Sequence, residues 1–288
     1  MHFHFDFSTI EILWTLTFAG QLVLLVVLMG RDRVQRFPWF TTSIVLVGLR
    51  LLTQKMLSGR LAPLPFSAVL ISLVDLGAIC GLLVLLELAR HAFGGVKRRT
   101  WIVGALAMLV VGGVVVGFWG AWPDWKTLNS DPNLAVLRVM QLFGQKGSLL
   151  VDVLAIEVGL VIVLLGRGLS GGWRSHTQRL AIGLSTAAIS QLAVQGILQA
   201  VFAKAVPKTQ VEYDRIIGLR DKIFNANNVV YLVVMAWWVA CLWMDEPGTA
   251  VLEPADDVEV EIPAQAETVE TPGEVDPTPE TEKQDSER

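Results

Sequence analysis

The stretch 67–90 reads SAVLISLVDLGAICGLLVLLELAR and is apolar along most of its length. It is long enough to cross the hydrocarbon core of a bilayer, for which a helix needs about 20 residues. A segment inside lipid has no water to satisfy its backbone, so a single span of this kind has to be helical. Similar runs recur at 8–30, 39–57, 101–120, 147–167, 178–201 and 226–244. The sequence therefore predicts an all-α integral membrane protein, in which residues 1–244 form a seven-transmembrane-helix bundle.

The composition points to the same class. The chain is 53% hydrophobic and has a mean hydropathy of +0.53, both above what soluble domains show. Its basic residues lie in short segments between the apolar runs, which excludes the continuous basic surface of a nucleic-acid-binding protein. The lipid bilayer is the one partner that these runs require, and we expect a multi-pass protein of the cell (cytoplasmic) membrane.

The connections between the runs predict an orientation. Those at 31–38, 91–100 and 168–177 are short and basic, and Asp32 is their only acidic residue. The opposite connections are longer and mix acidic with basic residues. Because short cytoplasmic loops carry an excess of Lys and Arg, we expect the N-terminus outside and the C-terminus inside. No Lys or Arg precedes the first run, so we expect 8–30 to be a retained span and not a cleaved signal.

The last 44 positions, 245–288, differ in character from the rest of the chain. They carry a charge of −13 against +9 for residues 1–244, which together give the net −4, and they hold six of the twelve prolines. Such a segment buries too little apolar surface to offset the entropy of ordering, so it is predicted to be a disordered acidic cytoplasmic tail. Together with the basic inner loops, the tail could engage a cytoplasmic or membrane protein partner.

Two outer connections are long enough to hold structure. In 121–146 the segment NLAVLRVMQLF has apolar residues at helical spacing, which predicts a short interfacial helix. In 202–225 a group of charged residues suggests a solvated helical segment that leads into the last span.

Four charged residues lie inside the predicted spans away from their ends, at bilayer depth: Arg50, Asp75, Asp152 and Glu157. A charge at bilayer depth is costly, about 2.5–3.5 kcal/mol even on the lowest scales, so such residues are functional candidates. The spans of Arg50 and Asp75 are joined by a short connection and should be antiparallel neighbours, which predicts an ion pair at matched depth. The pair would serve either as a structural clasp or as a polar wall of a ligand site.

Uncharged polar residues gather in the outer half of the bundle. Gln191, Gln195 and Gln199 recur every four residues and form one stripe on span six. Asn228 stands near the outer end of span seven. Amides of this kind can simply hold helices together by hydrogen bonds. Their clustering on one side instead predicts a cavity that opens to the outside.

Part of the pattern around Asp75 returns 77 positions later. The residues shared by 74–100 and 151–177 include Asp75 with Asp152, a later Arg, a Gly-Gly pair and a Thr. Either a helical hairpin is duplicated in the same orientation or the similarity is coincidental. Separately, Gly77-x-x-x-Gly81 and Gly113-x-x-x-Gly117 predict close helix approach, which would put spans three and four inside the bundle.

The sequence holds no complete catalytic or cofactor motif. The four histidines lie outside the spans, and neither HExxH nor GxSxG occurs. We therefore expect no catalytic residue, cofactor or metal, and a non-enzymatic protein of sensor or receptor-like type. It would bind a small polar or ionic ligand through Arg50, Asp75, Asp152, Glu157, Gln191, Gln195, Gln199 and Asn228. A structural or assembly subunit of a membrane complex and a transporter or ion-coupled carrier remain alternatives.

Overall fold

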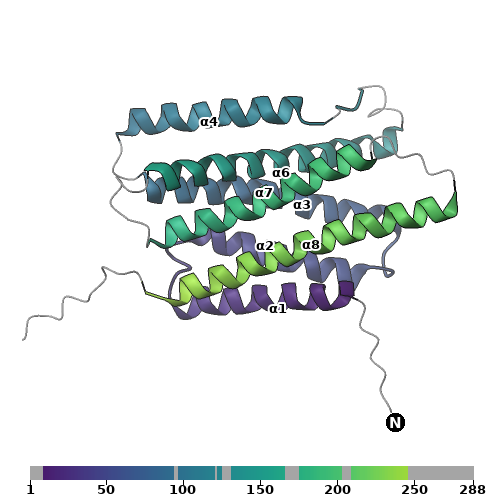
Figure 1. Ribbon diagram of the computed structural model, residues 1–288, viewed down its shortest axis with the longest axis horizontal. Coiled ribbons are helices and arrows are strands. Elements are labelled where there is room, and N and C mark those ends of the chain that lie inside the picture. Colours follow the sequence, from purple (N-terminus) through teal and green to yellow (C-terminus); the bar gives the residue numbers. More distant parts are fainter. Residues whose placement is uncertain are drawn as a thin grey trace, which may run out of the picture. The chain divides into compact units, whose positions relative to one another are not determined.

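A computed structural model of the protein describes residues 9–93, 97–120, 122–124, 131–165, 175–202 and 209–245. Within these ranges all regular structure is helical (Figure 1). The helices are α1 (Thr9–Gly30), α2 (Pro38–Leu57), α3 (Pro63–Ala92), α4 (Arg98–Phe118), α6 (Pro132–Leu165), α7 (His176–Phe202) and α8 (Gln210–Trp243). Each of the seven predicted runs falls on one of them.

Six of these helices, all except α2, are long and apolar enough to cross a membrane. The prediction of a helical membrane bundle is therefore confirmed at that level. Helix α2 has 20 residues but is less apolar, because it carries Arg50 and Lys55 together with several hydroxyl residues. The predicted tail falls almost entirely outside the described residues, and only Asp245 of it is described.

Two helices extend well beyond the predicted spans. The expected separate interfacial helix in 121–146 is wrong, because α6 runs without interruption from Pro132 to Leu165. Pro132 is its only proline, and a proline in the first turn does not disturb a helix. The charged segment before the last span is helical as expected and continuous with it in α8. Thr209 caps α8 by accepting a hydrogen bond from the Glu212 amide at 3.3 Å.

Six helices form a closed ring in which each contacts the next, in the order α1, α2, α3, α6, α7, α8 and back to α1. Helix α3 also touches α7 across the ring. Helix α4 contacts only α6 among the described helices and lies at the edge in Figure 1. The prediction that span four sits inside the bundle is therefore wrong. Its exposed face carries Val103, Leu106 and Val110, as expected of a lipid-facing helix.

Small residues let α3 and α6 pack side by side in the same direction. A Cβ added to Gly81 would lie 2.8 Å from Val151, and one added to Gly147 would lie 3.3 Å from Ala78. Gly144 faces Val74 and Asp75 in the same way. The helices thus keep one parallel register over about two turns, as small residues allow in membrane bundles. The other glycines of the two predicted motifs, Gly77, Gly113 and Gly117, face no atom within 4 Å, so the motifs do not act as expected.

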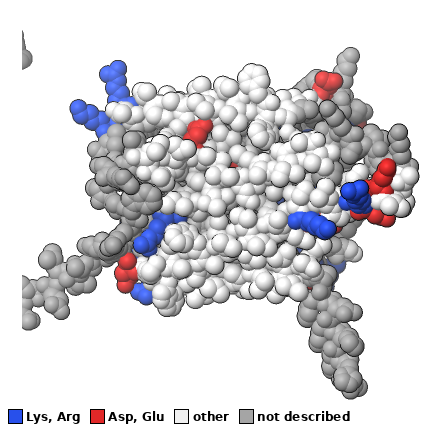
Figure 2. Space-filling model, in the orientation of Figure 1, with Lys and Arg blue, Asp and Glu red and all other residues white. Residues whose placement is uncertain are grey.

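The packed core lies in one half of the bundle. Its large, fully buried side chains include Leu24, Leu28, Phe40, Met235 and Trp238. Every buried residue of the core clusters belongs to the half of its helix nearest one end of the bundle. That end, called the basic end below, holds the end of α1, the starts of α2, α4 and α7, and the ends of α3, α6 and α8. In Figure 2 the coloured side chains on the visible face lie mostly near the helix ends.

At the basic end, Glu87 of α3 supplies the missing cap of α2. Phe37, the residue before α2, offers no side-chain cap, and the first amides of any helix lack partners within it. The Glu87 carboxylate accepts hydrogen bonds from the amides of Trp39 at 3.3 Å and Phe40 at 3.1 Å. Its side chain is buried, so the cap ties the start of α2 to the end of α3 away from solvent.

Asp245, just beyond α8, closes the same end of the ring. Its carboxylate lies 3.4 Å from the guanidinium groups of both Arg31 and Arg33, which follow α1. Arg31 also stacks 5.2 Å from the ring centre of Trp243. Because Asp245 is largely exposed, we expect these pairs to contribute little to stability.

The packing predicts opposite outcomes for two glycines. A Cβ on Gly183 would overlap the indole of the buried Trp238, so Gly183→Ala should lower the free energy of unfolding by about 1–3 kcal/mol, as overpacking does. Gly113 faces open space on α4, so Gly113→Ala should leave stability unchanged or slightly raised. Reversible unfolding in mixed micelles measures both variants. Equal stability of the two would contradict the α7–α8 packing described here.

The capping role of Glu87 makes a second prediction. Glu87→Ala leaves two buried amides of α2 without partners and should lower the free energy of unfolding by about 1–3 kcal/mol. Glu87→Gln should lose less, because its amide oxygen can still accept one of the two bonds. Asp245→Asn is the matched control, an acid in an exposed ion pair at the same end. Thermal unfolding in detergent should rank Glu87→Ala below Glu87→Gln and Asp245→Asn near the unchanged protein.

Candidate functional site

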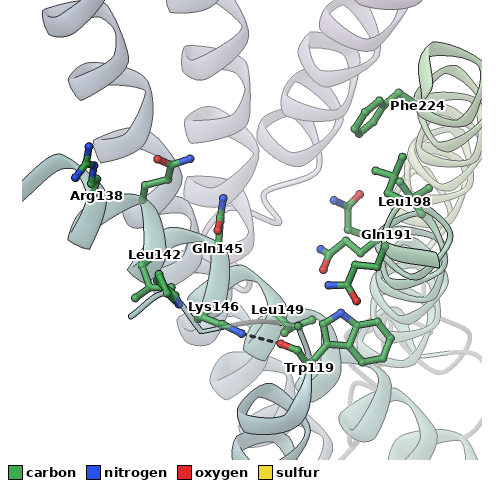
Figure 3. Close-up of a pocket in the computed structure, with 15 residues that line it drawn as sticks. Trp119, Arg138, Leu142, Gln145, Lys146, Leu149, Gln191, Leu198 and Phe224 are labelled. Atoms are coloured by element: carbon green, nitrogen blue, oxygen red, sulfur yellow. Dashed lines mark hydrogen bonds between the residues drawn. The ribbon is translucent and has the colours of Figure 1, made fainter. Parts of the chain in front are cut away.

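A large cavity opens between α6 and α7 at the end of the bundle opposite the basic end. Its volume is about 740 Å³, within the range of small-molecule sites. Figure 3 shows side chains of α6 facing those of α7 across it, with Trp119 at one side and Phe224 of α8 at the other. The lining contains five glutamines, two basic residues and no carboxylate. We call it the glutamine cavity.

The α6 wall carries Arg138, Gln141, Gln145 and Lys146. Their spacing of three, four and one residues places them on one face of a helix, and Leu142 and Leu149 continue the same stripe. The wall exists because α6 extends beyond the predicted span, toward the end opposite the basic end. Arg138 and Gln141 belong to the segment predicted to be a separate interfacial helix, and Gln145 lies just after it in the same connection.

The α7 wall consists of the glutamines that were predicted to form one stripe on span six. Gln191, Gln195 and Gln199 all line the cavity, as the prediction of an outward-half polar cavity expected for them. Gln191 is fixed from behind by α8. The Asn227 amide donates to Gln191 Oε1 at 2.9 Å, and Asn227 Oδ1 accepts from the Ser190 hydroxyl at 2.7 Å. With its oxygen occupied, Gln191 keeps its NH₂ group as a donor for other partners.

Lys146 brings positive charge to the cavity mouth. Its ammonium donates to the carbonyl of Trp119 at 2.7 Å, which is drawn dashed in Figure 3, and lies 4.4 Å from the ring centre of Trp122. Neither partner carries a negative charge. No carboxylate lies within salt-bridge distance of Lys146 in the described ranges, so its charge is not neutralised there.

The predicted ion pair between Arg50 and Asp75 does not form. Arg50 lines a separate small cavity of about 200 Å³, together with Ser148 and Asp152 of α6. Asp75 turns to the other side and lies against Gly144, and its Oδ1 has no hydrogen-bond partner in the part of the chain that the structure describes. Arg50 shares the small cavity with Val74 and Gly77 of α3, so the two helices meet at this level, but Asp75 lies against Gly144 of α6.

The eight predicted site residues thus divide into five groups. The three glutamines share the glutamine cavity, Arg50 and Asp152 share the small cavity, and Asp75 lies between α3 and α6. Glu157 is half-buried deeper on α6 and lines neither cavity. Asn228 is exposed and contributes nothing to either, and its neighbour Asn227 is the residue that reaches the site.

Sequence reasoning missed most of the α6 wall, and Lys146 and Trp119 with it. The pattern of Arg138, Gln141 and Gln145 at helical spacing was a usable signal once α6 is taken as one helix. The role of Glu87 had no such signal, because a residue near the end of a span is ordinarily solvated.

No protein-family model, curated protein or solved structure matches this chain. What the site can do is therefore argued from its own chemistry. Five carboxamides offer both donors and acceptors, and two cations without a lining carboxylate favour a ligand that carries negative charge.

Two adjacent asparagines provide a direct test of the α7–α8 contact. Asn227→Leu removes both hydrogen bonds to α7 and should lower the free energy of unfolding by about 1–2 kcal/mol, the range of interhelical hydrogen bonds in membranes. Asn228→Leu changes the same side chain at an exposed position and should leave it unchanged. Unfolding titrations with a denaturing detergent compare the two. A larger effect at Asn228 would contradict the assigned rotation of α8.

Proposed function

We propose that the protein is a non-enzymatic, sensor-like membrane protein that binds a small polar ligand, with net negative charge, in the glutamine cavity. The observation that carries this is the convergence of five glutamines, Arg138 and Lys146 on one cavity without a carboxylate in its lining. If these residues served only to hold helices together, their side-chain amides would form hydrogen bonds with each other. Among the described residues, Asn227 of α8 bonds to Ser190 and Gln191 of α7 and fixes Gln191 from the outside of the cavity.

The orientation and the tail belong to the same proposal. With the basic end in the cytoplasm, the glutamine cavity faces outward, and α2 crosses the bilayer as the seventh span. The acidic segment 245–288 and the inner loops then lie on the side where a separate partner could receive the signal. The attachment of Asp245 to Arg31 and Arg33 supports this arrangement, because it places the start of that segment beside the first inner loop.

A carrier is the alternative that a specific observation favours. Arg50 and Asp152 line a second polar cavity nearer the middle of the helices, and the repeated segments α3 and α6 pack directly against each other. Related helices around a central charged site are the arrangement of many transporters. The third candidate, an assembly subunit, would use the polar residues as contacts with other chains.

Native mass spectrometry of the full chain, extracted gently from its own membrane, tests the proposal. We expect a non-lipid small molecule bound to the unchanged protein. Gln195→Leu, which removes an amide from the middle of the α7 wall, should lose that molecule while it remains folded. Gln54→Leu is the matched control, because Gln54 is an exposed glutamine on α2 that lines neither cavity.

The outcomes separate the candidates. A small molecule retained equally by Gln195→Leu would place the ligand outside the glutamine cavity and contradict the proposal. Other membrane chains co-extracted without a small molecule would favour the assembly subunit. A bound molecule that also crosses proteoliposome membranes with the protein present would favour the carrier.

A further inference from the structure

A third cavity, of about 280 Å³, lies at the basic end between the start of α2 and the end of α3. It is independent of the glutamine cavity, which lies at the opposite end of the bundle. Its lining changes in character along the helices. Arg36, Arg90 and His91 stand at the end of the bundle, while Trp39, Leu83 and Leu86 line the deeper part. Seven residues separate Leu83 from Arg90, a rise of about 10 Å along a helix.

The deeper part faces outward from the helix pair. Trp39 is 43% exposed and Leu86 is 37% exposed, so both offer apolar surface to whatever surrounds the bundle. In a bilayer that surrounding is acyl chain, and a tryptophan at this position sits at the level of the lipid headgroups. The cavity is therefore a groove with a cationic head region and an apolar lower region.

The negative charge in the groove is already engaged. Glu87 is buried, and both of its oxygens accept hydrogen bonds from the amides that begin α2. It forms no salt bridge with either arginine of the groove within the described residues. Arg90 is exposed and has no hydrogen bond or ion pair to any described residue. Arg36 lies 5.5 Å from the ring centre of Phe37.

We propose that this groove binds the headgroup of an anionic glycerophospholipid. The guanidinium groups of Arg36 and Arg90 hold the phosphate, for which their planar donor geometry is suited. One acyl chain lies along Leu83 and Leu86, beside Trp39. Basic pockets between membrane helices take up anionic headgroups in this way, and the amphipathic lining distinguishes the groove from the diffuse attraction of a basic surface.

The test titrates the purified full chain with phosphatidylglycerol and with phosphatidylcholine of the same acyl chains, and counts bound lipids by native mass spectrometry. The unchanged protein should bind phosphatidylglycerol more tightly. Arg36→Gln or Arg90→Gln should each weaken that binding about fivefold, and both together about thirtyfold, since one arginine near a membrane surface contributes about that factor. Phosphatidylcholine binding should change little.

Arg99→Gln is the matched control. It removes one charge from the same end, at an exposed position on α4 outside the groove. An equal loss of binding in Arg99→Gln would reduce the effect to the general charge of the basic end and overturn the proposal. Equal affinity for the two lipids in the unchanged protein, or unchanged preference in the double variant, would overturn it as well.

A variant that keeps every charge covers the case in which the arginine variants do not fold. Leu86→Trp fills the lower part of the groove at a partly exposed position, where a larger side chain can be accommodated. It should weaken phosphatidylglycerol binding at least about fivefold while Arg36 and Arg90 remain, since the acyl chain loses most of its contact there. Unchanged binding in Leu86→Trp would contradict the acyl-chain placement.

Discussion

The requirement that backbone groups inside a membrane find partners within the protein shapes the basic end of this fold. Helix α2 begins without a side-chain cap of its own, and its first amides would otherwise face an apolar surrounding. The buried carboxylate of Glu87 on α3 answers this requirement with two hydrogen bonds. A buried charge is tolerated because the positive end of the α2 dipole and two donors surround it. Helix α2, the one described helix that is not apolar enough to count as a membrane span by composition, is thereby attached to α3, which also contacts α6 and α7.

The same division between ends explains where a site can form. Large side chains such as Leu28, Phe40 and Trp238 fill the space between helices at the basic end. Toward the other end the core clusters stop, and α6 and α7 present amides and cations to each other beside leucine and valine side chains. Polar groups that converge without satisfying one another require water or a ligand between them. The glutamine cavity thus forms at the end of the bundle where the facing residues of α6 and α7 are no longer all apolar.

Much of this could be predicted from the sequence, because apolar length fixes where a spanning helix lies. All seven runs became helices, and the four-residue spacing of Gln191, Gln195 and Gln199 correctly placed them on one wall. Apolar length does not determine how each helix is rotated about its own axis. Matched depth suggested a pair between Arg50 and Asp75, yet one rotation sends Asp75 to Gly144 of α6. Asn227 and Asn228 differ by 100° on a helix, and sequence alone did not indicate which one faces α7.

The sequence also did not reveal where one helix ends and the next begins. The apolar residues at helical spacing in 133–143 favoured a short interfacial helix separate from the fifth run, although no proline after Pro132 interrupts α6. Tertiary contacts decided in favour of continuity: Gly144 and Gly147 fit against α3, which stabilises the part of α6 that propensity leaves open. The error hid one whole wall of the cavity, so the predicted site consisted of one helix face and scattered charges.

The continuity of α6 and α7 also limits how a ligand in the cavity could act. Both walls belong to helices that run on into the packed core, where the Ser185 hydroxyl of α7 donates to the carbonyl of Ala155 on α6 at 2.8 Å. A Cβ on Gly159 would overlap Ser185, so the two helices are already as close there as their atoms allow. Under the proposed function, any change in the spacing of the cavity walls must therefore turn about this contact. Because both helices are unbroken on either side of this contact, such a rotation would move their ends at the basic end in the opposite direction. Under the proposed function, a ligand in the cavity would affect the loops at the basic end in this way.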